Sequence, residues 1–394
     1  MSSRSALPVI VFVALQTGKG ANGGIASLGE IMRGLQDLRP VLLTNLETKF
    51  TRGCRASGIE VHIVPEAAQR GWRRAPFAAA VSYVRYTLAV FNITRRTRAR
   101  VIHANDPLAF QMVVGAARLL PNLRLVLNIR DTLDPYRAPP QRRYRALFKA
   151  ADHVLMLSHD MVERWNEIVP GLRAKASATY SVVDHEAFAP QPLSEDLPRV
   201  VLVSGVVSEK KGQLEYLTKV APHLAQTDIE TWFVGDFDPE HDSYARACAE
   251  AARPLGTKVR FLGYQADMPG VLARAHVLAV PSRYEGLMRS MIEAMSEGRP
   301  VVSTDVASAN EMLSKPGAQA GMVIPIDEIE QMAPHLIRLT EDEDYNRQLG
   351  AAGATLARKY FDRAAVVERY AATYRALIGG KSNAKALQGT DGAH

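Results

Sequence analysis

The feature that most constrains this chain is a repeated alternation of short apolar runs with amphipathic helical patterns. In the first half, helical patterns at about 24–38, 77–98 and 108–119 separate apolar runs. These runs are PVIVFVAL, PVLLTN, VHIVP, VIHAN, LRLVLNIR and DHVLMLS. Buried strands that alternate with helices indicate parallel βαβ units. The sequence therefore predicts an α/β fold with a doubly wound parallel sheet.

The second half of the chain starts the alternation again. It contains a helical pattern at about 212–225 and the apolar runs RVVLVSG, TWFVGD, KVRFLG, HVLAVPS, PVVST and GMVIP. The polar, Pro-rich stretch APQPLSEDLP at 189–198 is typical of a linker. At 394 residues the chain exceeds what one hydrophobic core usually holds. We therefore expect two Rossmann-like doubly wound domains that face a central cleft, because ligands of such sheets bind beyond the carboxyl ends of the strands.

The predicted boundaries follow the linker and the last amphipathic pattern. We expect an N-terminal domain at 1–190, a C-terminal domain at 191–362, a C-terminal helix at 363–378 that packs back near the N-terminal domain, and a flexible tail at 379–394.

Cysteine content and hydropathy limit the class of protein. Cys54 and Cys248 lie far apart without metal-ligand spacing, so neither a disulfide framework nor a zinc site is expected, which fits a reducing compartment. The apolar run at 7–15 follows Arg4, as in a signal peptide, but it continues into TGKGANGG without a cleavage pattern of small residues. We expect it to be a buried first strand. No apolar run approaches the roughly 18 residues that span a bilayer.

The net charge of +7 is distributed unevenly. Residues 1–190 carry a net charge of +12, and residues 191–394 carry −5. A basic half fits nucleic acid, an anionic membrane surface or a phosphorylated substrate. No pattern typical of a helix-turn-helix, an RNA-recognition motif or a zinc finger is present, so we expect no nucleic-acid partner.

The first candidate motif is the glycine-rich stretch TGKGANGGIASL at 17–28, between the first strand and the first helix. Its glycines let the backbone approach a ligand closely, and the helix N-terminus behind them favours an anion or a sugar oxygen. It matches neither the GxGxxG fingerprint nor a P-loop. A flexible surface loop is the alternative.

The second candidate motif, SGVVSEKKGQLEYL at 204–217, also lies between a strand and a helix. A lysine next to Gly212 can reach a pyrophosphate there as a compact positive charge. The alternative is that Lys210 and Lys211 are solvated surface charges.

The third candidate motif, EGLMRSMIE at 285–293, contains two carboxylates eight positions apart. On one continuous helix they would differ by about 80° in direction. Glu285 and Glu293 can act together only if Glu285 lies in a turn before the helix. The backbone N–H groups of Gly286 and Leu287 would then stand at the helix start, where anions bind. We expect Gly298 to end this helix.

Together these elements resemble a known family. A GG loop after the first strand, a KG element in the second domain, and E-x7-E followed by AM-x-x-G-x-PVV are similar to the retaining GT-B glycosyltransferases of the GT4 family. The passages ADHVLMLSHDM and YSVVDHEAFAP add to this resemblance, which spans about residues 9–377. It implies a nucleotide-diphosphate sugar as co-substrate, with a UDP-sugar favoured and GDP-mannose next, and no cofactor or metal.

The resemblance also implies that the domain at 1–190 binds the acceptor and the domain at 191–362 the nucleotide-sugar donor, and it implies roles for individual residues. Glu285 is expected to bind hydroxyls of the donor sugar, and Lys211 to neutralise the diphosphate leaving group; these two are the predicted catalytic residues. The N–H groups of Gly286 and Leu287 are expected to hold phosphate, and Glu293 the ribose hydroxyls. The glycines of the GG loop, Gly23 and Gly24, are expected to close on the donor from the N-terminal domain.

The chain departs from the family pattern at three places, one of which is VASAN at 306–310 in place of the usual glycines before Glu311. Val206 stands where the family usually has a phosphate-binding arginine, and Arg283, Arg289 or Arg130 are candidates to replace it. Many members have a histidine where this chain has NIRDT, with Arg130 followed by Asp131. We expect Arg130 to contact the substrate.

One motif favours a different chemistry. The DFD sequence at 236–238 has the DxD form through which another glycosyltransferase fold binds a divalent cation. Metal binding there is the alternative to a metal-independent enzyme.

A basic stretch with aromatic residues runs from 69 to 100. Val81, Val84, Leu88 and Phe91 recur at helical spacing, which predicts that this helix packs against the sheet. The remaining arginines can dock on an anionic membrane or form a solvated basic face. The stretch QRRYR at 141–145 raises the same two possibilities.

The sequence thus predicts a retaining, metal-independent hexosyltransferase. Its acceptor is expected to be a lipid-linked sugar or a polysaccharide in cell-envelope glycan synthesis, and its location cytoplasmic, at the inner face of the membrane. Two rivals are a nucleotide-sugar epimerase of the same fold and a catalytically impaired nucleotide-sugar binding protein, which Val206 favours.

Overall fold

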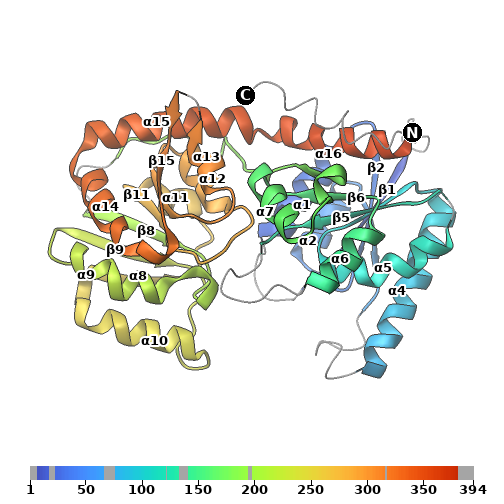
Figure 1. Ribbon diagram of the computed structural model, residues 1–394, viewed down its shortest axis with the longest axis horizontal. Coiled ribbons are helices and arrows are strands. Elements are labelled where there is room, and N and C mark those ends of the chain that lie inside the picture. Colours follow the sequence, from blue (N-terminus) through green and yellow to red (C-terminus); the bar gives the residue numbers. More distant parts are fainter. Residues whose placement is uncertain are drawn as a thin grey trace. The chain divides into compact units, whose positions relative to one another are not determined.

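The chain divides into two compact units, each built on a parallel sheet (Figure 1). The computed structural model describes residues 7–16, 23–65, 76–120, 122–132, 141–193, 198–315 and 317–379. The first unit comprises Met1–Arg130, Pro140–Val182 and Arg363–His394, and the second comprises Asp131–Pro139 and Val183–Asp362. The predicted α/β class with two doubly wound sheets is confirmed.

The first unit contains a seven-stranded sheet with the order β3-β2-β1-β4-β5-β6-β7. Its strands are β1 (Val9–Ala14), β2 (Arg39–Thr44), β3 (Glu60–Ile63), β4 (Val101–Ala104), β5 (Arg124–Ile129), β6 (His153–Met156) and β7 (Ala176–Ala178). Strand β1 is buried along its whole length and pairs in parallel with β2 and β4. The apolar run at the start of the chain is therefore an inner strand of the sheet, as predicted.

Helices connect these strands, and their starting points follow local side-chain chemistry. The connecting helices are α1 (Gly23–Gly34), α2 (Lys49–Ala56), α4 (Pro76–Thr97), α5 (Pro107–Leu119), α6 (Gln141–Ala150) and α7 (His159–Ile168), and the unit also contains α16 (Arg363–Ile378), which follows the second unit in the chain. Asp106 caps α5 because its carboxylate accepts hydrogen bonds from the N–H groups of Leu108 and Ala109, both at 2.8 Å. Pro107 fits the first helical position, where no N–H partner is needed.

Helix α4 buries a different face from the one that its sequence predicted. Ala79, Tyr86 and Val90 are buried, whereas Val84 and Leu88 are 54% and 56% exposed. The prediction that Val84 and Leu88 pack against the sheet is therefore wrong. The helix carries two apolar stripes, and periodicity alone does not show which of them meets the rest of the unit.

The C-terminal helix α16 packs on the first unit. The Tyr374 hydroxyl hydrogen-bonds to His103 Nδ1 of β4 at 2.9 Å, and its ring meets Phe12 of β1 edge-on. Burial, with a smaller effect of the Arg130 charge, lowers the pKa of His103 to about 3. The imidazole is therefore neutral at physiological pH, and the helix is anchored through a neutral hydrogen bond and aromatic contacts.

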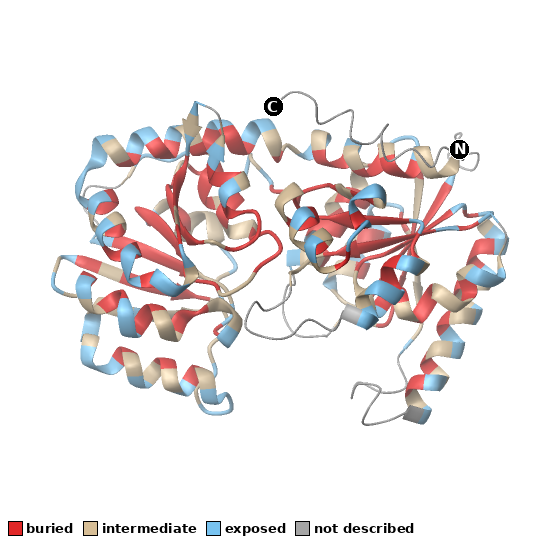
Figure 2. Ribbon diagram, in the orientation of Figure 1, coloured by how far each residue is buried: buried red, intermediate tan, exposed pale blue. Residues whose placement is uncertain are grey.

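The second unit contains a six-stranded sheet with the order β10-β9-β8-β11-β12-β15. Its strands are β8 (Arg199–Ser204), β9 (Ile229–Val234), β10 (Val259–Gly263), β11 (Val277–Val280), β12 (Val301–Thr304) and β15 (Gly321–Ile324), and a short antiparallel pair joins β13 (Ser314–Lys315) to β14 (Ala318–Gln319). The pairs within the six-stranded sheet are parallel. Figure 2 shows that both sheets are largely buried, while the outer faces of the helices are exposed.

The helices of the second unit follow the predicted alternation with one difference. They are α8 (Gln213–Lys219), α9 (Ala221–Leu224), α10 (Ser243–Ala252), α11 (Met268–Ala273), α12 (Arg289–Ser296), α13 (Ala309–Leu313), α14 (Met332–Glu341) and α15 (Glu343–Tyr360). The single helix predicted at 212–225 is two helices that meet at Val220. Pro222 explains the break, because it has no N–H to continue the helical ladder. Among the described helices, none is long and apolar enough to cross a bilayer.

Candidate active site

Except for Glu293, which is in α12, the predicted site residues of the second unit lie on two loops that follow neighbouring strands. Strands β8 and β11 pair in parallel, with Leu202 opposite Leu278, so the loops after them leave the same edge of the sheet. The backbone N–H of Arg283 donates to the carbonyl of Lys210 at 2.8 Å and joins the two loops. The KG element and the E-x7-E element therefore meet at the carboxyl edge, as expected of a ligand site in such a sheet.

Glycines make this close approach possible. Gly212 has a φ of +67°, and a Cβ at this position would lie 2.0 Å from the carbonyl oxygen of Pro281. Gly205 has a φ of +138°, and the aliphatic part of Lys211 passes over the place where a side chain would start. Both glycines are required by backbone conformation and by a near neighbour, so they determine where Lys211 can reach.

The buried side chain of Gln213 holds the loop after β8 in shape. Its Oε1 accepts from the N–H of Ser208 at 3.2 Å, and its Nε2 donates to the carbonyl of Val206 at 3.1 Å. Gln213 was not predicted to have this role, because a glutamine at the start of a helix is ordinarily solvated. Its position directly after the KG element is the only local signal.

Glu285 is the centre of the ionic cluster. Its side chain is buried, with the residue 5% exposed. Lys211 Nζ lies 2.7 Å from Oε1, Lys210 Nζ lies 3.3 Å from Oε2, and the Ser282 hydroxyl donates to Oε1 at 3.0 Å. The two lysines are therefore partners of a buried carboxylate, and the alternative that they are solvated surface charges is wrong.

The electrostatics of this cluster keep Glu285 ionised. Burial by itself would raise the pKa of Glu285, yet the charges of Lys211 and Lys210 hold that pKa below its usual range. Burial opposes the charge of Lys210 as well, but Glu285 and Asp131 raise its pKa. Asp131 contacts Lys210 at 2.5 Å within the same unit. The site thus combines ammonium groups and an ionised carboxylate away from solvent, where charges act strongly.

Hydrogen bonds from distant residues fix the turn that carries Glu285. The Thr132 hydroxyl donates to the carbonyl of Glu285 at 2.8 Å, and the Ser308 hydroxyl donates to the carbonyl of Gly286 at 2.5 Å. Glu285 lies in the turn before the helix, as predicted. Helix α12 begins at Arg289, however, later than expected. The N–H groups of Gly286 and Leu287 therefore belong to the turn and not to the first turn of the helix.

Glu293 lies in the second turn of α12 and is paired with Arg289, whose Nη2 is 3.2 Å away. Burial raises the pKa of Glu293, while Arg289 acts in the opposite direction. Arg283 lies 3.4 Å from Glu209 and 3.6 Å from Glu215. Two of the three arginines that can replace the missing cation at Val206 are thus held by carboxylates. Val206 itself is 50% exposed on the same loop as Lys211.

The remaining predicted residues belong to the first unit. Gly23 and Gly24 are the first residues of α1, and residues 17–22 of the glycine-rich loop lie outside the described residues. Arg130 directly follows β5 and is partly buried. Two buried asparagines that the sequence did not single out, Asn105 after β4 and Asn128 in β5, carry amide atoms without a hydrogen-bond partner among the described residues.

The DFD motif shows no arrangement for a metal in the described residues. Asp238 is exposed and pairs with His241 at 3.0 Å, and within the described ranges no three His, Cys, Asp or Glu side chains are grouped to hold an ion.

Two family models match most of the chain. The glycosyl transferase 4-like domain matches residues 22–174, and the glycosyl transferases group 1 model matches residues 198–342. The chain belongs to the GT4-type glycosyltransferases of the GT-B fold. The GT4 resemblance of the sequence is thereby confirmed.

Several known members of this family are similar to the chain. It is 27% identical over 209 residues to the phosphatidyl-myo-inositol mannosyltransferase of Mycolicibacterium smegmatis, covering 51% of this chain and 52% of that protein. It is 24% identical over 317 residues to the lipopolysaccharide core biosynthesis glycosyltransferase LpsE of Rhizobium meliloti, covering 76% and 86%. The chain spans about half the length of several curated relatives that it matches.

The fold also matches solved structures. Anabaena HepE, solved in complex with UDP and glucose, aligns with a TM-score of 0.74 at 21% identity, covering 93% of this chain and 99% of that one. This likeness supports the GT-B fold of the described units.

The ion cluster predicts strong coupling between Lys211 and Glu285. Lys211→Met leaves a buried carboxylate with one lysine fewer, and Glu285→Gln leaves two lysines without their shared carboxylate. We expect each single variant to lower the free energy of unfolding. The double variant should lose less stability than the sum of the two single losses, with a coupling energy of about 1 kcal/mol or more.

Urea denaturation of the four proteins measures this coupling. Lys219→Met is the matched control, because Lys219 is an exposed lysine of the same unit, 4.0 Å from Glu330, and should change stability little. Strict additivity of Lys211→Met and Glu285→Gln would show that the buried pair does not organise the site.

Proposed function

We propose that the protein is a retaining, metal-independent hexosyltransferase that transfers a sugar from a nucleotide-diphosphate sugar. The observation that carries this proposal is the buried Glu285 carboxylate, held by Lys210 and Lys211 at the carboxyl edge of the second sheet. A chain of the GT4 family with this cluster has an ionised carboxylate for donor hydroxyls and an ammonium for the leaving diphosphate in one place.

The proposed mechanism depends on the negative charge that develops on the diphosphate as it leaves the donor sugar. As the acceptor hydroxyl oxygen bonds to the anomeric carbon, the bond from that carbon to the diphosphate oxygen breaks. Lys211 stabilises the negative charge on the diphosphate, which is electrostatic catalysis by a group already in position. A diphosphate oxygen takes the proton of the acceptor hydroxyl on the same face, so configuration is retained without a protein base.

The other predicted residues position the donor in this proposal. Glu285 binds hydroxyls of the transferred sugar, and Glu293 binds the ribose. The N–H groups of Gly286 and Leu287 hold phosphate from the turn before α12. For the first unit, we propose that Gly23, Gly24 and Arg130 contact the substrate.

The two lysines of this site have different contacts, which indicates different roles. Lys210 contacts both Asp131 and Glu285, whereas Lys211 contacts Glu285 and extends over Gly205. We infer that Lys210 keeps Glu285 ionised while Lys211 turns to the diphosphate. This arrangement supplies a cation on the loop where Val206 replaces the usual arginine.

For the donor, we propose a UDP-sugar first and GDP-mannose second. HepE, with the same fold, was solved with UDP and glucose, and one relative is a mannosyltransferase. For the acceptor, we propose a lipid-linked sugar or a polysaccharide of the cell envelope. The mannosyltransferase and LpsE relatives carry names that refer to a phosphatidyl lipid and to lipopolysaccharide core.

Helix α4 supports a membrane contact in this proposal. Phe77, Val84 and Leu88 are exposed and fall on one side of the helix, since they are seven and four residues apart. Arg85 and Arg95 add positive charge along the same helix. An apolar stripe with flanking arginines suits the surface of an anionic bilayer. We therefore propose that the enzyme acts in the cytoplasm, at the inner face of the membrane.

Turnover tests the proposed reaction. Incubation with UDP-sugars or GDP-mannose and an undecaprenyl-diphosphate-linked sugar should yield a glycosylated product whose new linkage has the anomeric configuration of the donor, as measured by NMR. Lys211→Ala should lower kcat by about 10²–10³, because it removes a preorganised charge from the transition state. A chelator should leave the rate unchanged.

The rival functions give different results in the same assay. Conversion of the donor sugar to its epimer without an acceptor would identify an epimerase. Donor binding without turnover on any acceptor would identify an impaired binding protein, and arginine at position 206 (Val206→Arg) should then be tested for recovered activity.

Vesicle sedimentation tests the membrane contact. The protein should bind vesicles of anionic phosphatidylglycerol more tightly than neutral phosphatidylcholine, and Val84→Ser with Leu88→Ser should weaken that binding several-fold. Leu119→Ser is the control, because Leu119 is 69% exposed on the neighbouring helix α5. Equal losses from the α4 and α5 variants would rule out α4 as the contact surface.

A further inference from the structure

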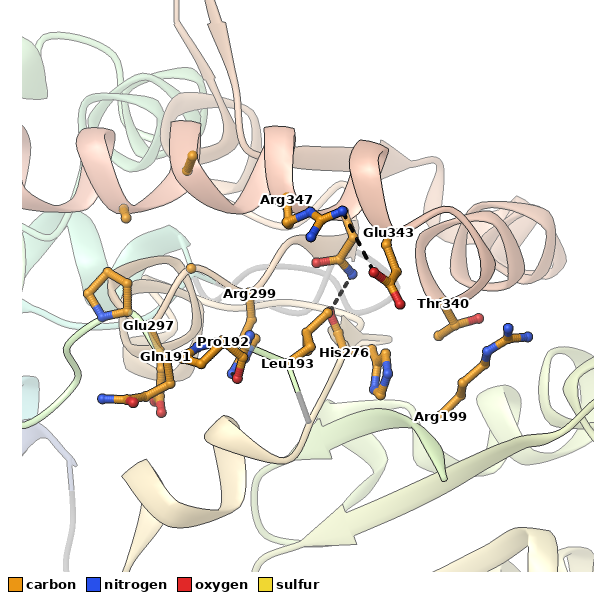
Figure 3. Close-up of a pocket in the computed structure, with 15 residues that line it drawn as sticks. Gln191, Pro192, Leu193, Arg199, His276, Glu297, Arg299, Thr340, Glu343 and Arg347 are labelled. Carbon is orange, nitrogen blue, oxygen red and sulfur yellow. Dashed lines mark hydrogen bonds and ion pairs between the residues drawn. The ribbon is translucent and has the colours of Figure 1, made fainter. Parts of the chain in front are cut away.

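A second candidate binding site lies at the amino edge of the sheet in the second unit, at the opposite end of its strands from Glu285. Arg199 is the first residue of β8, His276 immediately precedes β11, and Glu297 and Arg299 precede β12. These residues line a pocket of about 840 Å³, with part of its wall from α15 (Figure 3). The volume falls within the range of sites that bind small molecules.

Arginines from three separate elements make the pocket positive. Arg199 comes from β8, Arg299 from the segment before β12, and Arg347 from α15. Arg299 is 2% exposed, and its Nε and Nη2 donate to the carbonyls of Leu272 and Ala273 at 3.1 and 2.9 Å. The guanidinium is therefore held rigidly by backbone groups, and its charge remains in the wall of the pocket.

His276 responds to this positive charge. Burial, followed by the charges of Arg299 and Arg199, lowers its pKa to about 4, so the ring is neutral at pH 7. Its Nδ1 accepts a hydrogen bond from the N–H of Val200 at 3.2 Å, which leaves the proton on Nε2. His276 thus adds a neutral donor to the charged donors of the arginines.

Glu297 supplies a buried acceptor that is available to a ligand. The residue is 2% exposed, and its Oε2 has no hydrogen-bond partner among the described residues. Burial is the main cause that raises its pKa to about 7. A buried carboxyl oxygen without a donor is costly, and a ligand hydroxyl would satisfy it.

Arg199 and Arg347 can release the carboxylates that they now contact. Arg347 pairs with Asp344 at 2.7 Å and with Glu343 at 3.7 Å, and Arg199 lies 3.8 Å from Glu341. These pairs are solvent-exposed, and exposed ion pairs contribute little. A phosphate group can therefore replace the carboxylates and make bidentate contacts with guanidinium groups.

We propose that this pocket binds a small phosphorylated sugar, with the phosphate on the arginines and a sugar hydroxyl donating to Glu297. The combination of three arginines with a buried carboxyl oxygen indicates this class of ligand. Inorganic phosphate held at the arginines presents no sugar hydroxyl to the buried Glu297 oxygen, and a neutral sugar makes no use of the three arginines. This site is separate from the proposed donor site, and it stands whether or not the donor proposal holds.

Calorimetry on the full-length protein tests the site with three probes: glucose 6-phosphate, glucose and inorganic phosphate. Glucose 6-phosphate should bind most tightly. The double variant Arg199→Gln with Arg347→Gln should weaken its binding about tenfold or more, because charge-assisted hydrogen bonds are lost. Glu297→Leu should weaken glucose 6-phosphate binding to a similar extent and leave the binding of inorganic phosphate unchanged.

Two controls locate the binding. Arg338→Gln removes an exposed arginine of α14 that does not line the pocket, and it should have no effect. Lys211→Ala alters only the proposed donor site, so binding lost in this variant would assign the probe to that site and refute the pocket. Equal affinity for inorganic phosphate or for glucose, or no saturable binding of any probe, would also overturn the proposal.

Discussion

The interaction on which the site depends is the pairing of one buried carboxylate with two lysines. Glu285 is removed from water, which by itself favours its neutral form, and Lys210 and Lys211 reverse that preference. A charged group of this kind is stable only while its partners stay in place. The loops after β8 and β11 must therefore stay in fixed positions relative to each other. The glycines, the buried glutamine and the hydroxyl groups around them hold the loops in those positions.

The fold provides this constraint through parallel strands. Neighbouring strands β8 and β11 deliver their loops to one edge, where Gly212 allows the backbone at Pro281 to approach and Gln213 fixes the loop of Lys211. The amino edge of the same sheet brings together Arg199, Glu297 and other residues on the segments before the strands. The second unit thus has polar groups at both ends of its strands, with apolar strands between them, and each end can serve a different ligand.

Much of the fold could be predicted from sequence, because the alternation of apolar runs and helices is a local pattern. The position of Glu285 outside the helix was also predicted, from the spacing of two carboxylates that act together and from the turn residues that flank them. The later start of α12 did not, because Ser308, which bonds to the turn, is 22 residues away. The exposed face of α4 was predicted wrongly, since both stripes of that helix are apolar and only tertiary packing selects one. The environment of Glu297 could not be predicted either, because its neighbours come from strands and helices far apart in the sequence.

The most direct test of the central claim is calorimetric titration with UDP, GDP, UDP-sugars and GDP-mannose, with and without a chelator. The account predicts that one nucleotide and its sugars bind, that the chelator has no effect, and that Lys211→Ala and Glu293→Ala each weaken binding. Absence of binding to every nucleotide, or binding that requires a divalent cation, would contradict the assignment of the Glu285 cluster as a metal-independent donor site.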